Sequence, residues 1–176
     1  FVDSDTKMVV TAADPEKRIV TEINGAPAGR EYARMVGLEV SKLTPMIFAA
    51  YPVIVKIGGE YFVRSPAQVN EDESLLFFCA IDEGIVLTVA EGKDMVENLR
   101  NTFQQVRTDI GEPVLTLGCD CLFRRLEMEQ KGLRDDIAKI MEENKVIGFS
   151  TYGEQYNAMH VNQTFTGVAI GRKQGS

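Results

Sequence analysis

The sequence is short of histidine, of cysteine and of positive charge, and each shortage argues against a class of function. Lys and Arg number 19 against 26 Asp and Glu, so the formal net charge is −7. A general nucleic-acid partner is not expected, because binding a phosphate backbone requires a basic face. No apolar run approaches the ~20 residues that a membrane helix needs, and no signal-peptide pattern appears. We therefore expect no membrane partner.

The three cysteines do not form the pattern of a disulfide framework. Their number is odd, and Cys119 and Cys121 lie one residue apart. Such usage is typical of a reducing compartment, so we expect a cytoplasmic protein. The 176 residues, 44% of them hydrophobic, suit one globular domain spanning 1–176, or two small ones that share a core. Because the chain begins at Phe1 and not at Met, we expect a piece of a longer protein.

The first half of the chain has the alternating pattern of β-hairpins. Asn24-Gly25 and Gly58-Gly59 supply the positive-φ positions of tight turns. Ser65-Pro66 is expected to end a strand, and 69–74 to form a polar turn. A third hairpin is expected across Asp82-Glu83-Gly84. The expected elements are strands at 7–12, 18–23, 53–57, 61–64, 75–81 and 85–89, a helix at 29–37, and a loop holding Pro45 and Pro52.

In the second half the apolar period changes from 2 to 3.6. One stripe predicts a helix over 94–110, with Asp94 and Glu97 as a capping box and Gly111 as its stop. A strand at 113–117 is followed by a turn at 118–121 and a helical segment at 121–143 that Gly132 kinks or splits. Strands at 146–151 and 163–170 complete an α-β-α-β-β order. The fold class is therefore α+β (mixed α/β), with helices packed on a mixed sheet.

The strand, helix and strand from 114 to 151 form a β-α-β unit, which makes the two strands parallel. Their carboxyl ends then share one edge of the sheet, where ligands commonly bind. If strand 163–170 pairs antiparallel, it brings the only histidine to that edge. We expect one ligand pocket there, in which a helix N-terminus favours an anion. Its expected residues are Cys121, Tyr152, Glu154, His160 and Asn162.

Three arginines are candidates for binding a ligand carboxylate. Arg124 and Arg125 lie in the first turns of the helical segment, where a positive charge opposes the helix dipole, so each should have a carboxylate partner. That partner is either internal, Glu127 or Glu154, or it belongs to a ligand. Arg64 stands at a strand end and has the same two interpretations, a fork for a ligand carboxylate or a surface salt bridge.

The remaining candidates also have a functional and a structural interpretation. Tyr152 and Glu154 either hold an amine and stack on a ligand, or form a turn. Cys119 and Cys121 either bind metal or pack a turn, and a helix N-terminus would lower the thiol pKa of Cys121. His160 is a strand-end histidine, a ligand contact or a haem ligand. No nucleophile motif accompanies it, so we expect no enzyme and no catalytic residue.

Five segments, taken in order, resemble the C-terminal half of the FIST domain, a sensory domain of bacterial signalling proteins that also occurs in F-box proteins. The segments are 18–28 (RIVTEINGAPA), 59–66 (GEYFVRSP) with 69–72, 121–127 (CLFRRLE), 146–154 (VIGFSTYGE) and 160–167 (HVNQTFTG). Together they cover about residues 17–171.

The resemblance implies a ligand-sensing module and not an enzyme. It implies a small-molecule ligand such as an amino acid, bound without a cofactor, and a signalling output domain or kinase as partner. Haem with nitric oxide sensing through His160 is the alternative that the resemblance implies, and an interaction scaffold without a ligand is another. The N-terminal FIST half is expected as a further partner, because only the C-terminal half is recognised here.

Overall fold

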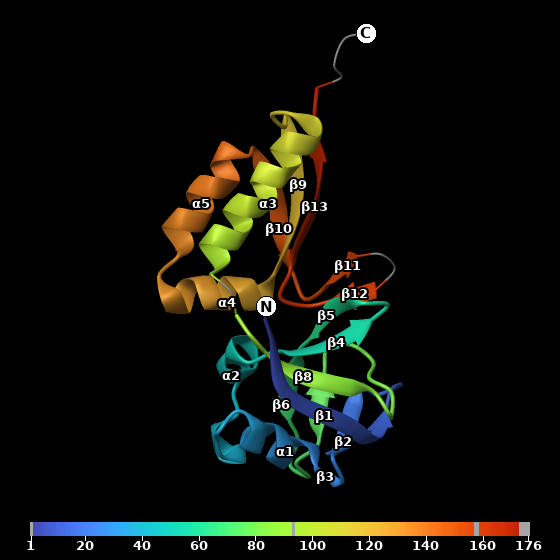
Figure 1. The fold of residues 1–176 in the computed structure, drawn as a ribbon. Coiled ribbons are helices and arrows are strands. Elements are labelled where there is room, and N and C mark those ends of the chain that lie inside the picture. The colour runs from blue at the N-terminus through green and yellow to red at the C-terminus, as the bar shows by residue number, and fades with distance from the viewer. Residues whose placement is uncertain (1, 93, 157–158, 173–176) are drawn as a thin grey trace. The chain divides into compact units, whose positions relative to one another are not determined.

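The protein has the α+β fold that its sequence predicts, with helices and strands in mixed sheets (Figure 1). A computed structural model describes residues 2–92, 94–156 and 159–172. The chain divides into two compact units. Unit 1 comprises residues 1–92 and 160–162, and unit 2 comprises 93–159 and 163–176. Among the described residues, no helix is both long and apolar enough to cross a membrane.

Unit 1 is built on one sheet with strand order β5-β4-β8-β1-β2-β7-β6, and β3 pairs with β2 beside this path. Its elements are β1 (Val2–Asp14), β2 (Ile19–Ile23), β3 (Ala26–Pro27), α1 (Ala28–Met35), the 3₁₀ helix η1 (Val40–Lys42), α2 (Pro45–Ala50), β4 (Val53–Ile57), β5 (Glu60–Arg64), β6 (Pro66–Val69), β7 (Leu75–Phe77) and β8 (Val86–Glu91). Residues 160–162 return to this unit, and the strand β12 (Met159–Val161) ends within them.

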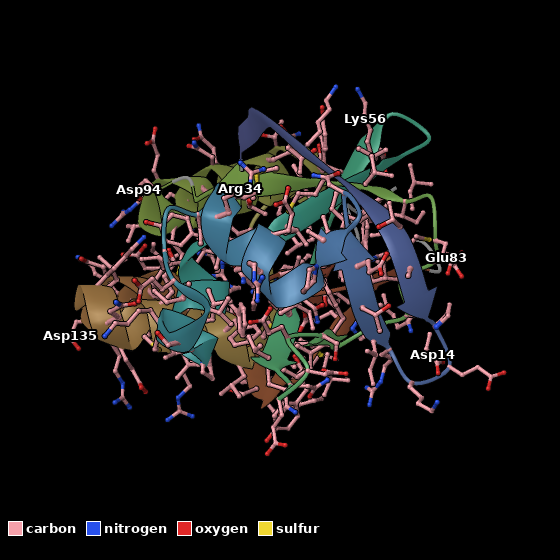
Figure 2. The ribbon with its side chains drawn as sticks, turned by 90° about the horizontal axis from the view of Figure 1, so that it is seen from below. Asp14, Arg34, Lys56, Glu83, Asp94 and Asp135 are labelled. Carbon is pink, nitrogen blue, oxygen red and sulfur yellow. The ribbon has the colours of Figure 1, made fainter. Side chains whose placement is uncertain are left out.

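The two predicted hairpin turns of unit 1 are confirmed. Asn24 and Gly25 have φ of 54° and 74° between β2 and β3, and Gly58 and Gly59 have φ of 61° and 91° between β4 and β5. The side chains of Asp14, Lys56 and Glu83 project outward from this unit (Figure 2). Its core lies under α1 and α2. There Tyr32 and Phe48 meet with ring centroids 5.5 Å apart, and Tyr32 Oη donates to Tyr51 O at 2.5 Å.

The predicted third hairpin is wrong. β7 pairs with β6 and β2, whereas β8 pairs with β1 and β4. Gly84 does turn the chain, with φ of 81°, but its N–H donates to Val10 O and so directs the chain to β1. The apolar patterns of β7 and β8 suit many strand partners, so the two strands do not pair merely because they are neighbours in sequence. β7 instead pairs with β2, and β8 pairs with β1.

One proline prediction is confirmed and another fails. β5 ends at Arg64, just before Ser65-Pro66, as predicted, and a new edge strand, β6, begins at Pro66, where a missing N–H is tolerated. The expected loop around Pro45 contains α2. Pro45 occupies its first turn, and Thr44 Oγ1 caps it by accepting from Ile47 N at 3.4 Å.

Unit 2 packs helices on one face of a three-stranded sheet of order β10-β9-β13 (Figure 1). β9 and β10 are parallel and β13 is antiparallel to β9, as predicted. Its elements are α3 (Met95–Ile110), β9 (Leu115–Cys121), α4 (Leu122–Lys131), α5 (Arg134–Glu143), β10 (Val146–Thr151), β11 (Glu154–Tyr156) and β13 (Phe165–Ile170).

The helix signals of unit 2 are confirmed. Asp94 caps α3 by accepting from Glu97 N at 2.8 Å, and Gly111 follows its end with φ of 73°. Gly132, in the left-handed conformation, splits the long helical segment into α4 and α5. The predicted turn at 118–121 is wrong, however. β9 continues through Cys121, because both β10 and β13 pair with it along that stretch.

Three glycines lie side by side across this sheet and make room for an aromatic ring. Gly148, Gly118 and Gly167 are register partners on β10, β9 and β13. A β-carbon on Gly118 would lie 2.7 Å from the ring of Phe165, and one on Gly148 would lie 1.8 Å from Gly118 O. Phe165 packs on Phe103 with centroids 6.0 Å apart. The core around this pair consists of Met95, Leu99, Phe103, Met128, Ile137 and Ile140.

Candidate functional site

In unit 1 the end of β5 carries a buried guanidinium. The hairpin with β4 places Arg64 opposite Val53, and the residue is only 7% exposed. Its Nη1 donates to Val63 O at 3.4 Å and, through a short contact, to His160 O. Within the described part of the chain, no carboxylate lies in ion-pair distance of it. Because a buried charge is costly without a counter-charge, Arg64 is suited to an incoming anion.

In the segment 160–162, which belongs to unit 1, hydrogen bonds fix the orientation of Asn162 toward His160. Asn162 is fully buried, and Ser65 N donates to its Oδ1 at 3.2 Å. That bond fixes the amide, so its Nδ2 faces His160 Nε2 at 3.2 Å. An amide nitrogen only donates, and Nε2 must therefore accept. This contact favours the neutral imidazole with its proton on Nδ1.

The electrostatics of this group are those of a cationic site without an acid. Burial lowers the pKa of His160 from its ordinary value, and the positive charges of Arg64 and Arg18 lower it further. Burial raises the pKa of the Cys79 thiol to about 11, against the opposing effect of the same two arginines. Arg18 Nη1 donates to Phe78 O at 3.5 Å. A neutral imidazole and two guanidiniums can together bind an anionic group.

Haem ligation through the Nε2 atom of His160 does not fit this arrangement. Nε2 already accepts from Asn162, and the asparagine is itself held by Ser65 N. A metal at Nε2 would displace the amide donor that Asn162 directs at this nitrogen.

In unit 2 the carboxyl edge of the sheet carries a second group of predicted residues. Cys121 ends β9, precedes α4 and is 1% exposed. The predicted lowering of its pKa is wrong. Burial raises the pKa of this thiol, outweighing the backbone N–H groups of Phe123 and Gln163. Burial and a raised thiol pKa are consistent with the packing interpretation of Cys121, and its role in ligand binding stays a prediction.

The two arginines of α4 are paired internally, but not with the predicted acids. Arg124 Nε lies 2.6 Å from Asp120, and Arg125 Nε lies 3.2 Å from Glu129. Asp120 lies four residues before Arg124, and Glu129 lies four residues after Arg125. A spacing of four brings side chains together on a helix. Glu127, the partner expected for one of them, pairs with Lys131. Arg125 is thus a surface residue.

Glu154 is buried, and no Lys or Arg among the described residues forms an ion pair with it. It is 4% exposed, and its two carboxylate oxygens accept from the hydroxyls of Thr151 and Thr164. Burial raises the pKa of Glu154, and the hydroxyl donors only partly oppose it. Burial likewise raises the pKa of Asp120 despite Arg124. Tyr152, two residues before Glu154, is 74% exposed. Across the described residues, no three or more His, Cys, Asp or Glu side chains are arranged to hold a metal ion.

The predicted site residues thus form two groups. Arg64, His160 and Asn162 come together in unit 1, whereas Cys121, Arg124 and Glu154 lie around the end of β9 in unit 2. A single pocket that joins both groups stays a prediction. Sequence reasoning missed Arg18, Ser65 and Cys79. Arg18 has an unusual φ of 60°, but no local sequence signal marks it as a partner of a residue more than a hundred positions away.

Comparison with known families matches residues 28–157 to the model of the FIST C domain. The chain belongs to the FIST C domain family. The match covers about three quarters of the chain and includes Arg64 and Glu154, whereas His160 and Asn162 follow its end. FIST C is a sensory-type domain of signal-transduction proteins and not a known enzyme family. Searches of curated proteins and of solved structures find no match to the chain.

Proposed function

We propose that this FIST C domain senses an amino acid, which it binds through the α-carboxylate at the Arg64 site of unit 1. The observation that carries the proposal is the buried guanidinium of Arg64, for which the described residues provide no carboxylate. A planar guanidinium binds a carboxylate in a bidentate manner. Arg18 adds a second positive charge, and the proton on Nδ1 of neutral His160 supplies a further donor.

The direct test is a binding screen of L-amino acids by thermal shift and isothermal titration calorimetry. A ligand at 100 times its Kd stabilises the protein by about 2.7 kcal/mol. The same amino acids as α-amides form a matched control, because they lack only the carboxylate. We expect the acids to stabilise the protein and the amides to have no effect.

Two arginine variants decide whether Arg64 is the binding residue. Arg64→Met should abolish binding, and Arg64→Lys should weaken it, because lysine keeps the charge and loses the fork. Arg100→Met is the matched control, since Arg100 is an exposed arginine of α3. The proposal fails if no amino acid binds, or if Arg64→Met binds as tightly as the wild type.

The only histidine provides an independent spectroscopic reporter at the same site. A bound carboxylate would offset the positive charges that lower the pKa of His160, so ligand binding should raise that pKa. NMR titration of the single imidazole, with and without ligand, measures the change. An unchanged imidazole titration in the saturated protein would place the ligand elsewhere.

We further propose that the signal leaves through the returning segment to a signalling output domain or kinase, with the N-terminal FIST half as a neighbouring partner. Residues 160–162 belong to unit 1, while the chain on both sides of them belongs to unit 2. A ligand that orders His160 therefore acts on a segment continuous with β13. Hydrogen exchange should show slower exchange at 163–170 when ligand binds, and no change there would contradict this route.

A further inference from the structure

The sheet of unit 2 has one packed face and one bare face. Val146 and Phe165 point to the helices and join the core with Met95 and Phe103. The alternate residues of the same strands lie on the other face and are open to solvent. Their exposed fractions are 47% for Leu117, 58% for Ile147, 69% for Phe149, 63% for Val168 and 44% for Ile170. An apolar patch of this kind marks an interaction surface.

The register arranges this face in two rows across the three strands. In one row Ile147, Leu117 and Val168 are partners, and in the next row Phe149, Cys119 and Thr166 are partners. Neither row contains a charged residue. All three side chains of the first row are apolar and of similar size. In the second row the side chain on β10, Phe149, is bulky, whereas those on β9 and β13 are small.

We propose that this face binds the same face of a second copy of the chain, with a two-fold axis running along β9. Such an axis places β10 of each copy over β13 of the other. Phe149 then covers Thr166 of the second copy, so the bulkiest side chain faces a small one. Ile147 faces Val168, and Leu117 and Cys119 face their own counterparts. Two sheets packed in this manner lie about 10 Å apart.

Charge and area both favour a second copy as the occupant. Each chain carries a net charge of −7, but the two rows bring no charge into contact, so like-charge repulsion does not act within the interface. The exposed side chains amount to on the order of 500 Å² per copy, or roughly 1,000 Å² in total, which reaches the lower limit of a specific interface. We therefore expect a reversible dimer of moderate affinity.

Sedimentation velocity of the 176-residue chain tests the dimer. At about 100 μM protein we expect a dimer that dissociates on dilution. Phe149→Glu should weaken association by about 100-fold or more, because two carboxylates would enter the interface. Ile57→Glu, on a 41% exposed apolar residue of unit 1, should have no effect. The double variant Phe149→Glu/Thr166→Lys should regain the dimer, since the two positions face one another.

Cysteine cross-linking tests the position of the axis. Cys119 is partly exposed, whereas Cys79 and Cys121 are buried. Sheets about 10 Å apart hold the two Cys119 Cα atoms too far apart for a direct disulfide. A short bismaleimide should instead link the two thiols of a dimer, because each thiol adds across one maleimide double bond and forms a thioether. We expect a covalent dimer from the wild type and from Cys79→Ser, and none from Cys119→Ser. A wild type that stays monomeric without cross-links, or a dimer that Phe149→Glu leaves unchanged, overturns the proposal.

Discussion

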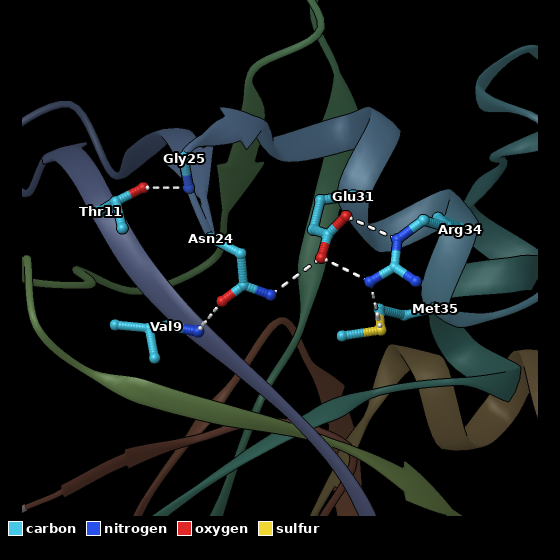
Figure 3. Close-up of polar contacts among 7 residues, drawn as sticks. All are labelled: Val9, Thr11, Asn24, Gly25, Glu31, Arg34 and Met35. Carbon is cyan, nitrogen blue, oxygen red and sulfur yellow. Dashed lines mark hydrogen bonds and ion pairs between the residues drawn. The ribbon is translucent and has the colours of Figure 1, made fainter.

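Among the residues whose burial is described, each unit buries one glutamate, and the pKa values of these two glutamates shift in opposite directions. In unit 1, Glu31 is 7% exposed and accepts at 2.8 Å from Arg34 and from Asn24 (Figure 3). The hydrogen bonds from Arg34 and Asn24 lower its pKa to about 2. In unit 2, Glu154 is 4% exposed and accepts from the hydroxyls of Thr151 and Thr164 and from the backbone of Thr164, and burial raises its pKa. The charged donor Arg34 outweighs the effect of burial on Glu31, whereas neutral donors offset only part of the effect of burial on Glu154.

Two asparagines in unit 1, Asn24 and Asn162, are oriented in the same way by a backbone N–H but favour opposite charge states of their neighbours. Asn24 Oδ1 accepts from Val9 N at 2.9 Å, which turns its Nδ2 toward Glu31 (Figure 3). Asn162 Oδ1 accepts from Ser65 N, which turns its Nδ2 toward His160. The first amide favours a charged carboxylate and the second favours a neutral imidazole. In both cases a backbone N–H selects the protonation state of a side chain that it does not contact.

The largest effect should come from filling the row formed by Gly148, Gly118 and Gly167 in the sheet of unit 2. Gly148→Ala places a β-carbon where Gly118 O lies 1.8 Å away, so we expect destabilisation by about 3 kcal/mol or more. Hydrogen exchange should show the loss within 115–121 and 146–151. Ser150→Ala on the same strand is the control and should change stability by less than about 0.5 kcal/mol. Equal stability of the two variants would contradict the close approach of β10 to Gly118 O.

Removing the charge of Glu31 should have the next largest effect. Glu31→Gln loses the ion pair with Arg34, and we expect a cost of about 1–2 kcal/mol in the free energy of unfolding. In the wild type this contribution is complete above pH 4.5 and is lost as pH falls toward 2, because the folded pKa is the lower one. Glu112→Gln is the control, since its ion pair with Arg107 is exposed. Denaturant unfolding at pH 7 and pH 3 measures both variants.

Glu154 should contribute less to the free energy of unfolding than Glu31 does, and its contribution should change with pH in the opposite direction. Its folded pKa lies above the ordinary value of 4.5, so its contribution is complete below pH 4.5 and is lost as pH rises through the folded pKa. Glu154→Gln should make the stability of unit 2 less dependent on pH in this range, leaving the similar contribution of Asp120. Hydrogen exchange of β10 and β13 measures it. Glu143→Gln on α5 is the control and should leave the dependence unchanged.

The smallest effect concerns the charge near His160. Arg18→Gln should raise the pKa of the imidazole, since Arg18 contributes less to its lowering than burial or Arg64 does. Arg30→Gln should not change it, because Arg30 pairs with Glu73. NMR titration of the single histidine measures both. A pKa that stays constant in Arg18→Gln would remove Arg18 from the candidate anion site.

The elements that could be predicted from the sequence are those that local physics decides. The stripe of α3 with its Asp94 cap, the split at Gly132 and the turn at Asn24-Gly25 each depend on residues within a few positions. The parallel pairing of β9 and β10 follows from the length of the connection between them. The α2 helix was missed because two prolines near it were interpreted as breakers, although Pro45 opens a helix.

The candidate site was only partly predictable, because its contacts are long-range. Arg64 was predicted to be either a fork for a ligand carboxylate or a surface salt bridge, but its bond to His160 O joins residues 96 positions apart. The edge argument assigned His160 to the sheet of β9, whereas its described contacts are with unit 1. The partners of Arg124 and Arg125 also differ from those expected, since several acids compete within one turn.

The return of residues 160–162 to unit 1 has a consequence for dissecting the protein. A fragment ending at Gly92 contains every strand of the large sheet, yet it lacks Asn162. The N–H of Ser65, which is fully buried in the intact chain, would lose its acceptor. No single cut therefore releases both units intact. The shortest N-terminal fragment that keeps the Arg64 site must run through residues 93–159 of unit 2 to reach Asn162, and such a fragment still lacks β13 of the three-stranded sheet.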